Sequence, residues 1–337
     1  MPPTILRRPV TVMVWLLLSV AGLVLSPFFV VLAALASAIT RRPQPLLLAR
    51  FLVAYFAYEL GVLVACGVLW LASGLGLRMR SPSFQKRHHG LLRWFVHGLA
   101  EHALELLKID VCSGSTPDAA RALQGGAPLI MFSRHAGPGD TVFLIDLLID
   151  RYRRLPSVVF KETLAIDPSV DLIAHRLPHA VLDTSRREEC EARIEQVTRD
   201  LPAHGVLVLF PEGGNFTVTR RRRAILKLWR RGESGKAAVA LEMEHVMPPH
   251  PGGALAALRG NPEADVLFAA HAGLGLAAFP RELWRRTPIG RTFHNQMWLA
   301  PAHDRPRDPD EQVKWLYAWW SRLDEWVAEQ GAEAPAS

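Results

Sequence analysis

The chain has 337 residues, half of them hydrophobic, and a mean hydropathy of +0.12, a composition that is unusual for a soluble enzyme and points to a membrane. The net charge of +7 and the sequence pI of about 9.7 suit an anionic partner; the hydrophobicity favours a membrane surface or a phosphate-bearing substrate over nucleic acid. The isolated cysteines Cys66, Cys112 and Cys190 exclude a disulfide framework and indicate a reducing, cytoplasmic setting for the globular part.

Two long apolar runs open the chain. Residues 9–40 contain no charged side chain, and residues 45–77 contain only Arg50 and Glu59. Each run exceeds the roughly 20 residues that cross a bilayer as a helix, and the first is too long for the core of a signal peptide. We therefore predict a membrane anchor of two hydrophobic helices over residues 1–80.

Basic residues flank both runs and bear on the orientation of the anchor. They lie before the first run, between the two and after the second: Arg7, Arg8, Arg41, Arg42, Arg50, Arg78, Arg80, Lys86 and Arg87. If both helices span, the positive-inside rule places both ends in the cytoplasm. A hairpin that dips into one leaflet would keep the basic connector inside as well. Both arrangements stay open, and both predict a cell-membrane protein whose globular domain faces the cytoplasm.

The segment after the anchor, residues 88–107, has apolar positions at helical spacing and should join the anchor to the globular domain. It carries His97, Glu101 and His102, but these complete no strong metal-ligand motif. We predict no metal and interpret the three side chains as a half-buried polar face.

From Ala127 onward, short β-rich runs alternate with helical ones. The expected strands are residues 128–132, 157–160, 180–182, 205–210 and 265–270, and the apolar positions Cys190, Ile194, Val197 and Leu201 recur at helical spacing. Such alternation predicts an α/β domain with a central, mostly parallel sheet and crossover helices. We place this domain at residues 81–327 and a disordered tail at residues 328–337.

A histidine and a carboxylate follow the first of these strands. His135 ends the apolar run, a Gly/Pro corner follows, and Asp140 opens the next apolar segment. A carboxylate that fixes the imidazole tautomer makes the histidine a general base. About one H-x4-D match is expected by chance in this composition. The chain has a second match at His303 and Asp308, but there the context is a charged, Pro-broken stretch.

A second motif follows the strand at 205–210. The sequence GVLVLFPEGGNFT passes from a buried strand into the turn Pro211-Glu212-Gly213-Gly214. Because active sites of open α/β sheets collect at the carboxyl ends of strands, His135 and Glu212 are expected to share one edge. A lipase-type hydrolase would need a nucleophile elbow, and the chain has no G-x-S-x-G motif.

Taken together, the two motifs resemble those of the glycerolipid acyltransferase family, which includes 1-acylglycerol-3-phosphate acyltransferases and has an H-x4-D box and a later F-P-E-G-T-R box. The resemblance implies that His135 and Asp140 are the catalytic pair. It also implies a set of residues that bind the phosphorylated acceptor: Lys161, Arg186 or Arg187, Phe210, Pro211, Glu212 and Gly213.

The reaction implied by the resemblance is transfer of a fatty acyl group from acyl-CoA or acyl carrier protein to the hydroxyl of a lysophospholipid at a phospholipid membrane. The implied acceptor is 1-acylglycerol-3-phosphate or a related lysolipid, and no cofactor is needed beyond the donor. No nucleic acid is involved.

The chain departs from the family pattern at both boxes. Arg134 stands where the family usually has Asn, and Gly214-Asn215 replace Thr-Arg, which removes a bidentate phosphate ligand. The run 220–223, four arginines, could supply the charge instead, or form a solvated helix start or a membrane-surface patch. The alternative function is a catalytically silent lipid-binding or scaffold protein with the same fold.

The C-terminal segment, residues 314–327, is predicted to be an amphipathic helix. Trp315, Trp319 and Trp326 lie near one face. They could pack in the core or anchor the protein at a membrane interface.

Overall fold

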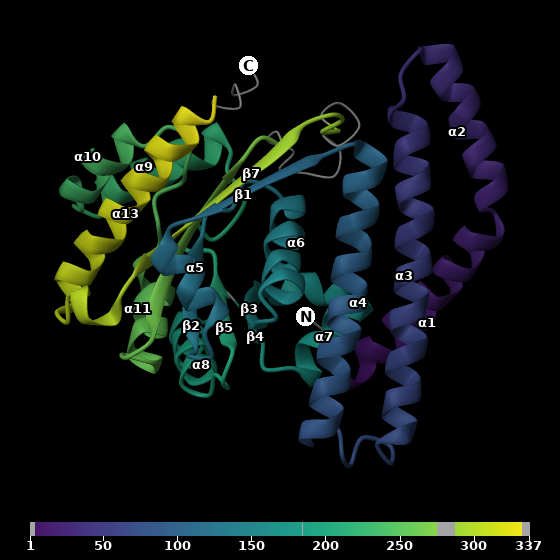
Figure 1. Ribbon diagram of the computed structural model, residues 1–337, viewed down its shortest axis with the longest axis horizontal. Coiled ribbons are helices and arrows are strands. Elements are labelled where there is room, and N and C mark those ends of the chain that lie inside the picture. The colour runs from purple at the N-terminus through teal and green to yellow at the C-terminus, as the bar shows by residue number, and fades with distance from the viewer. Residues whose placement is uncertain (1–3, 184, 275–286, 332–337) are drawn as a thin grey trace. The chain divides into compact units, whose positions relative to one another are not determined.

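The computed structural model describes residues 4–183, 185–274 and 287–331, and the chain divides into two compact units. One unit combines Met1–Lys108 with Phe160–Thr184, and the other combines Ile109–Val159 with Ser185–Ser337 (Figure 1). The predicted domain boundaries at residues 80 and 327 stay predictions. Of the predicted tail, residues 332–337 lie outside the described residues.

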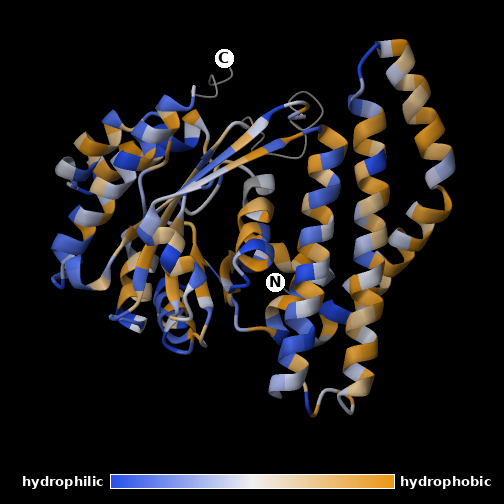
Figure 2. Ribbon diagram, in the orientation of Figure 1, coloured by the Kyte–Doolittle hydropathy of each residue, from blue (hydrophilic) through white to orange (hydrophobic). Residues whose placement is uncertain are grey.

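The first unit is mainly helical. Its elements are α1 (Thr4–Val24), α2 (Ser26–Thr40), α3 (Gln44–Ala72), α4 (Pro82–Leu107), α7 (Pro168–Arg176) and the short strand β4 (Ala180–Leu182). The first apolar run, predicted as one helix, divides at Leu25, because Pro27 in the first turn of α2 has no N–H to donate to the preceding turn. The second run forms one helix, α3. The apolar character of α1 to α3 is visible in Figure 2.

Buried polar contacts join the two chain segments of the first unit. The Asp171 carboxylate of α7 is 1% exposed and accepts hydrogen bonds from Arg7 Nη2 at 2.8 Å and Arg8 Nε at 2.7 Å. The Tyr55 hydroxyl of α3 lies 2.5 Å from Asp167 Oδ2 at the start of α7. Glu59 is fully buried on α3. The start of α1 and one side of α3 thus face protein rather than solvent or lipid.

A mostly parallel sheet forms the centre of the second unit. Among the described residues it has seven strands in the order β1-β7-β6-β2-β5-β3-β4, the last of which belongs to the first unit. The other strands are β1 (Asp110–Ser115), β2 (Leu129–Ser133), β3 (Leu155–Lys161), β5 (Gly205–Leu209), β6 (Asp265–Ala272) and β7 (Thr292–Ala300). Strand β2 is parallel to both of its neighbours, β5 and β6, whereas β7 is antiparallel to β6. The predicted α/β fold with a mostly parallel sheet is confirmed, and β1 and β7 are additions to it.

Helices cover both faces of this sheet. The described α-helices of this unit are α5 (Pro117–Gln124), α6 (Pro138–Asp146), α8 (Arg187–Arg199), α9 (Val218–Arg230), α10 (Ser234–Glu242), α11 (Pro251–Gly260) and α13 (Pro309–Glu329). On one face the Trp319 ring of α13 stacks on Phe268 at 4.4 Å, and on the other the Phe143 ring of α6 packs against Phe293 at 5.4 Å. The tryptophans of the C-terminal helix therefore pack on the sheet, the first of their two predicted roles.

Candidate active site

The two sequence motifs meet at one edge of the sheet. Strands β2 and β5 are parallel neighbours, with Phe132 opposite Leu209, so the residues that follow them leave the sheet side by side. The His135 ring packs against the Phe210 ring with their centroids 4.7 Å apart. The Phe216 N–H also donates a hydrogen bond to the His135 carbonyl at 2.9 Å. The expected shared edge is therefore present in the structure.

The turn of the second motif depends on a glycine. Gly213 has φ +67°, in the left-handed region that L side chains rarely adopt, and its N–H donates to the Phe210 carbonyl at 3.0 Å. A Cβ at this position would lie 3.2 Å from Cδ2 of His250. The main chain of His250 is itself fixed here, because its N–H donates to the Pro211 carbonyl at 2.8 Å. A side chain larger than hydrogen would strain this turn.

Arg134, the residue before the histidine, is buried and held by main-chain carbonyls. It is 2% exposed, and its Nε and Nη2 donate to the His245 carbonyl at 3.3 and 3.1 Å. Its Nη1 donates to the carbonyl of His271, whose Nε2 lies 2.9 Å from the Arg134 carbonyl oxygen. The guanidinium is therefore a buried and fixed part of the site. It lies near the Glu212 carboxyl group and acts on it electrostatically.

Glu212 is also buried, at 1% exposure, and its pKa is strongly shifted. Burial raises the pKa of this carboxyl to about 8, because desolvation disfavours the charged form. The Arg134 guanidinium, the nearby main-chain N–H groups of His135 and Met247 and the Trp320 indole act in the opposite direction without cancelling the effect of burial. Neither carboxylate oxygen has a hydrogen bond of ordinary geometry to a described residue. The group is thus mainly protonated at neutral pH.

This shift predicts a pH-dependent stability. Because Glu212 binds its proton more tightly in the folded than in the unfolded chain, the stabilisation is complete below the unfolded pKa of about 4.3 and is lost as pH rises through about 8. The loss is on the order of 5 kcal/mol, since one pKa unit corresponds to about 1.4 kcal/mol. We expect the thermal unfolding midpoint of the solubilised wild type to fall between pH 5 and pH 9, and Glu212→Gln to remove most of that fall.

Glu188→Gln, on the exposed first turn of α8, is the matched control and should keep the wild-type pH profile. A difference in unfolding midpoint between wild type and Glu212→Gln that stays constant from pH 5 to pH 9 would contradict the assignment.

The remaining predicted site residues are placed as follows. Asp140 lies in the first turn of α6, directly beyond the Gly137 corner, but its side chain lies outside the described part of the structure. Arg186 is exposed at the start of α8, and its Nη1 lies 3.1 Å from Oε1 of Glu189. Lys161 is exposed at the end of β3 and belongs to the other unit. The roles of these residues, like those of His135 and the second box, stay predictions.

The four arginines after the second box have separate roles. Arg220 Nη1 donates to the Asn215 carbonyl at 3.1 Å, and Arg221 donates to the carbonyls of Met243, Ala240 and Leu241 at the end of α10. The next two side chains, Arg222 and Arg223, are exposed on α9. The run therefore combines structural contacts with a solvated helix face.

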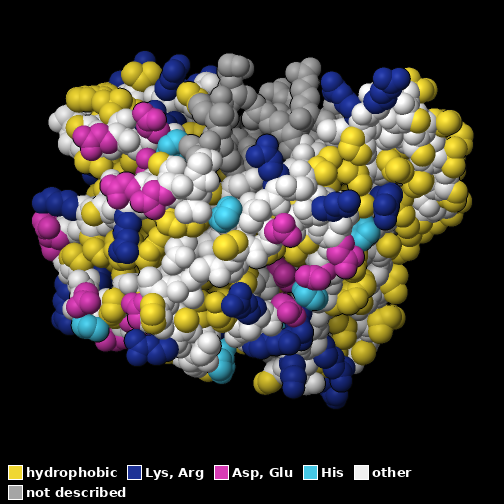
Figure 3. Space-filling model, turned by 45° about the horizontal axis from the view of Figure 1, so that its top comes forward, with side chains coloured by type: hydrophobic (Ala, Val, Ile, Leu, Met, Phe, Trp, Pro, Cys, Tyr) yellow, Lys and Arg dark blue, Asp and Glu magenta, His cyan; other side chains and the backbone are white. Residues whose placement is uncertain are grey.

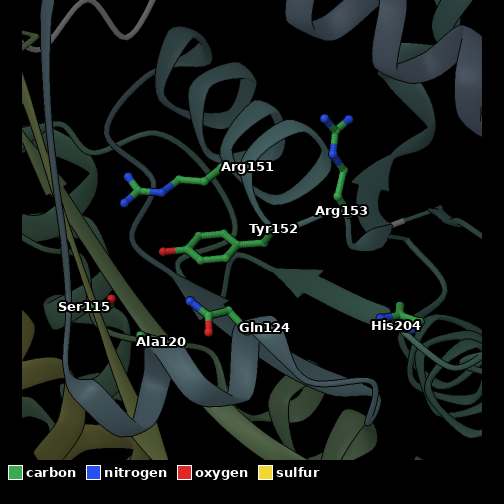
Figure 4. Close-up of a pocket in the computed structure, with 7 residues that line it drawn as sticks. All are labelled: Ser115, Ala120, Gln124, Arg151, Tyr152, Arg153 and His204. Atoms are coloured by element: carbon green, nitrogen blue, oxygen red, sulfur yellow. The ribbon is translucent and has the colours of Figure 1, made fainter.

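A separate pocket lies at the opposite edge of the sheet. It is lined by Ser115, Ala120, Gln124, Arg151, Tyr152, Arg153 and His204. His204 directly precedes β5, and Arg153 lies two residues before β3, so the pocket is at the amino ends of these strands. Arg151 and Tyr152 extend to the same side, whereas Arg153 points away from them (Figure 4). The cationic side chains do not converge on one point.

Sequence reasoning missed the contribution of the C-terminal helix to the site. The Trp320 side chain is fully buried and lies close to Glu212, and Asp324, one turn later, binds the chain at residues 244–246. Neither residue belongs to a recognisable motif. Their helical spacing from the other apolar positions of α13 indicates only that they face the sheet.

The comparison with protein families agrees with the two motifs. Residues 116–257 match the family model described as Acyltransferase, which represents the domain of the glycerolipid acyltransferases. The match begins before β2 and ends within α11, so it includes both motifs and stops before β6 and α13. No curated protein matches the chain.

Proposed function

Since the chain carries a domain of the glycerolipid acyltransferase family, we propose that it is a membrane-bound enzyme that transfers a fatty acyl group from acyl-CoA or acyl carrier protein to the hydroxyl of a lysophospholipid. The observation that carries this proposal is the position of His135 after β2, with its ring against Phe210 of the neighbouring motif. A half-exposed imidazole at the carboxyl edge of a parallel sheet can receive a proton from a bound hydroxyl.

The proposed reaction is a single direct attack. His135 removes the proton of the acceptor hydroxyl as that oxygen attacks the thioester carbonyl, and Asp140 holds the ring. Collapse of the tetrahedral intermediate breaks the C–S bond, and the imidazolium returns its proton to the departing thiolate. Thiolates are good leaving groups, so no covalent acyl-enzyme is required. Main-chain N–H groups at the glycine corner can stabilise the oxyanion.

The acceptor in this proposal is 1-acylglycerol-3-phosphate or a related lysolipid in phospholipid biosynthesis or remodelling. The substitution of Asn215 for the usual arginine bears directly on this choice, because a neutral amide cannot make the bidentate, charge-assisted contact of a guanidinium with a phosphate. Two cations nearby in the sequence, Arg220 and Arg221, bind main-chain carbonyls. These contacts favour a related lysolipid whose headgroup lacks a free phosphomonoester over 1-acylglycerol-3-phosphate itself.

Attachment to the membrane through α1 to α3 would bring the protein to its proposed lysolipid acceptor, which lies in the bilayer. Leu6–Val24 and Gln44–Ala72 are long and apolar enough to cross a membrane by length and composition. Hydrophobic side chains cover the surface of these helices in Figure 3. Arg7 and Arg8, at the start of α1, bind Asp171 of α7, so the N-terminal end of the anchor lies against that helix. We propose the cell membrane as the location and the cytoplasm as the side of the catalytic domain, by the positive-inside rule.

The test is an acyl-transfer assay on purified protein in detergent, with labelled acyl-CoA or acyl carrier protein as the donor and lysolipids with and without a phosphomonoester headgroup. We expect transfer to at least one lysolipid. We also expect Asn215→Arg to raise kcat/KM for the phosphomonoester acceptor by about tenfold or more, because a charge-assisted hydrogen bond contributes about 1.5–3 kcal/mol.

Asn261→Arg, at the end of α11, adds the same charge away from both motifs and should leave the preference unchanged. A wild type that transfers from neither thioester to any acceptor would overturn the enzyme and support the lipid-binding scaffold.

A further inference from the structure

The C-terminal helix α13 reaches the candidate active site through a buried carboxylate. Asp324 is 7% exposed and accepts hydrogen bonds from three consecutive main-chain N–H groups. Its Oδ2 accepts from Glu244 at 3.0 Å, and its Oδ1 accepts from His245 at 2.6 Å and from Val246 at 2.9 Å. Hydrogen bonds to an ionised acceptor are about twice as strong as neutral ones. Residues 244–246, which are in neither a helix nor a strand, are thereby fixed to α13.

The fixed segment in turn holds Arg134. Asp324 accepts hydrogen bonds from the N–H groups of His245 and Val246. The His245 carbonyl lies between these two N–H groups in the chain, and it accepts hydrogen bonds from both Nε and Nη2 of Arg134 at 3.3 and 3.1 Å. A guanidinium presents its N–H groups in a rigid planar fork, so a carbonyl that receives two of them restricts the orientation of the group. The His271 carbonyl, which accepts from Nη1, restricts it further. Asp324 therefore helps to set the place of Arg134 through a single intervening residue.

Arg134 is adjacent in the chain to His135 and lies near Glu212, on which its charge acts. The same helix also approaches Glu212 directly, because Trp320 precedes Asp324 by one turn and its indole lies close to the Glu212 carboxyl. Helix α13 thus holds Arg134 through His245 and approaches the Glu212 carboxyl directly. The sheet edge around Arg134 and Glu212 is made of loops. A rigid helix is therefore the element able to fix the positions of these two side chains relative to each other.

We propose that Asp324 is a positioning residue for the acyl-transfer reaction, acting through the His245 carbonyl and Arg134 on the turn that carries His135. This inference rests on the proposed function. It extends the active site to a helix that lies outside residues 116–257, the part matched by the family. The rival explanation is that Asp324 only stabilises the fold.

A double-mutant cycle separates the two explanations. We expect Asp324→Asn, which keeps the shape and removes the charge, to lower kcat about 10- to 100-fold and to leave KM for thioester and lysolipid within about twofold. Arg134→Lys keeps the positive charge but lacks the fork. If Asp324 acts through Arg134, Asp324→Asn costs less than about threefold when introduced into Arg134→Lys. Glu325→Gln, the exposed neighbour on α13, should leave kcat unchanged.

Multiplicative losses in the double variant, or a loss confined to KM, would overturn the proposal. A wild-type kcat in the Asp324→Asn variant would also overturn it. If Asp324→Asn does not fold, Asp324→Ser takes its place, because its hydroxyl retains one acceptor in a smaller volume.

Hydrogen–deuterium exchange tests the structural coupling between Asp324 and Arg134 without a measurement of enzyme activity. In the full-length protein, Asp324→Asn should speed exchange in residues 243–247 and also in residues 133–137, whereas Glu325→Gln should change neither. Faster exchange in 243–247 alone overturns the link to Arg134. A wild type that shows no acyl transfer overturns the proposed function, and the exchange result then decides on its own whether Asp324 positions Arg134.

Discussion

Replacing His135 with alanine is expected to lower the rate of acyl transfer by about 10³-fold, within the range of 10²- to 10⁴-fold that a general base contributes. The ring is only partly buried and packs on one face against Phe210. Its removal should therefore cost little stability, and the thermal unfolding midpoint should stay close to that of the wild type. The measurement is kcat with saturating thioester and lysolipid, together with the unfolding midpoint of the same preparation.

The chain supplies its own matched control for this experiment. His303 and Asp308 have the same spacing as His135 and Asp140, but the His303 side chain is 81% exposed and Asp308 caps the start of α13 by accepting from Asp310 and Glu311 N–H at 3.0 Å. His303→Ala should leave kcat unchanged. Equal activity of the wild type and His135→Ala would remove His135 from the mechanism.

Replacing Arg134 with asparagine, the residue usual in the family, is expected to destabilise this protein by about 3–5 kcal/mol. The guanidinium is buried, satisfies the carbonyls of His245 and His271, and lies near the buried Glu212. An amide is too short to replace these contacts. For a unit of this size the loss corresponds to a fall of roughly 10 °C in the thermal unfolding midpoint.

Arg134→Lys should fall between the wild type and Arg134→Asn, because it keeps a positive charge near Glu212 but makes fewer hydrogen bonds. The comparison is made at one pH, since Glu212 itself titrates. If Arg134→Asn unfolds at the wild-type temperature, the contacts of the guanidinium with His245 and His271 contribute nothing net to stability.

The sequence allowed the framework of the candidate site to be predicted. Strands β2 and β5 are continuous apolar runs bounded by Gly, Pro and charged residues, which is the pattern of a strand buried on both faces of a parallel sheet. Because the carboxyl ends of parallel strands share an edge, His135 and Glu212 could be expected to lie near each other. The structure confirms that β2 and β5 are direct neighbours.

Other parts of the structure leave little trace in the sequence. Strand β1, with the sequence DVCSGS, has neither an apolar run nor a clear alternation, because its residues are exposed or half-buried at an edge of the sheet. The burial of Arg134 could not be anticipated either, since it depends on main-chain carbonyls from residues 245 and 271, far along the chain. Carbonyl acceptors are present at every residue and carry no sequence signal.

The first unit combines two segments that are far apart in the chain, and this affects the order in which its contacts can form during synthesis. Asp167, Asp171 and Arg176, which bind α1 and α3, leave the ribosome only after the apolar helices and a part of the sheet have been synthesised. The contacts of α1 and α3 with these residues can therefore form only after residue 176 has been synthesised, so the unit closes late. Shortening the chain to begin after α4 would leave the buried Asp171 without Arg7 and Arg8. A soluble fragment made in that way would expose surface that the intact chain covers.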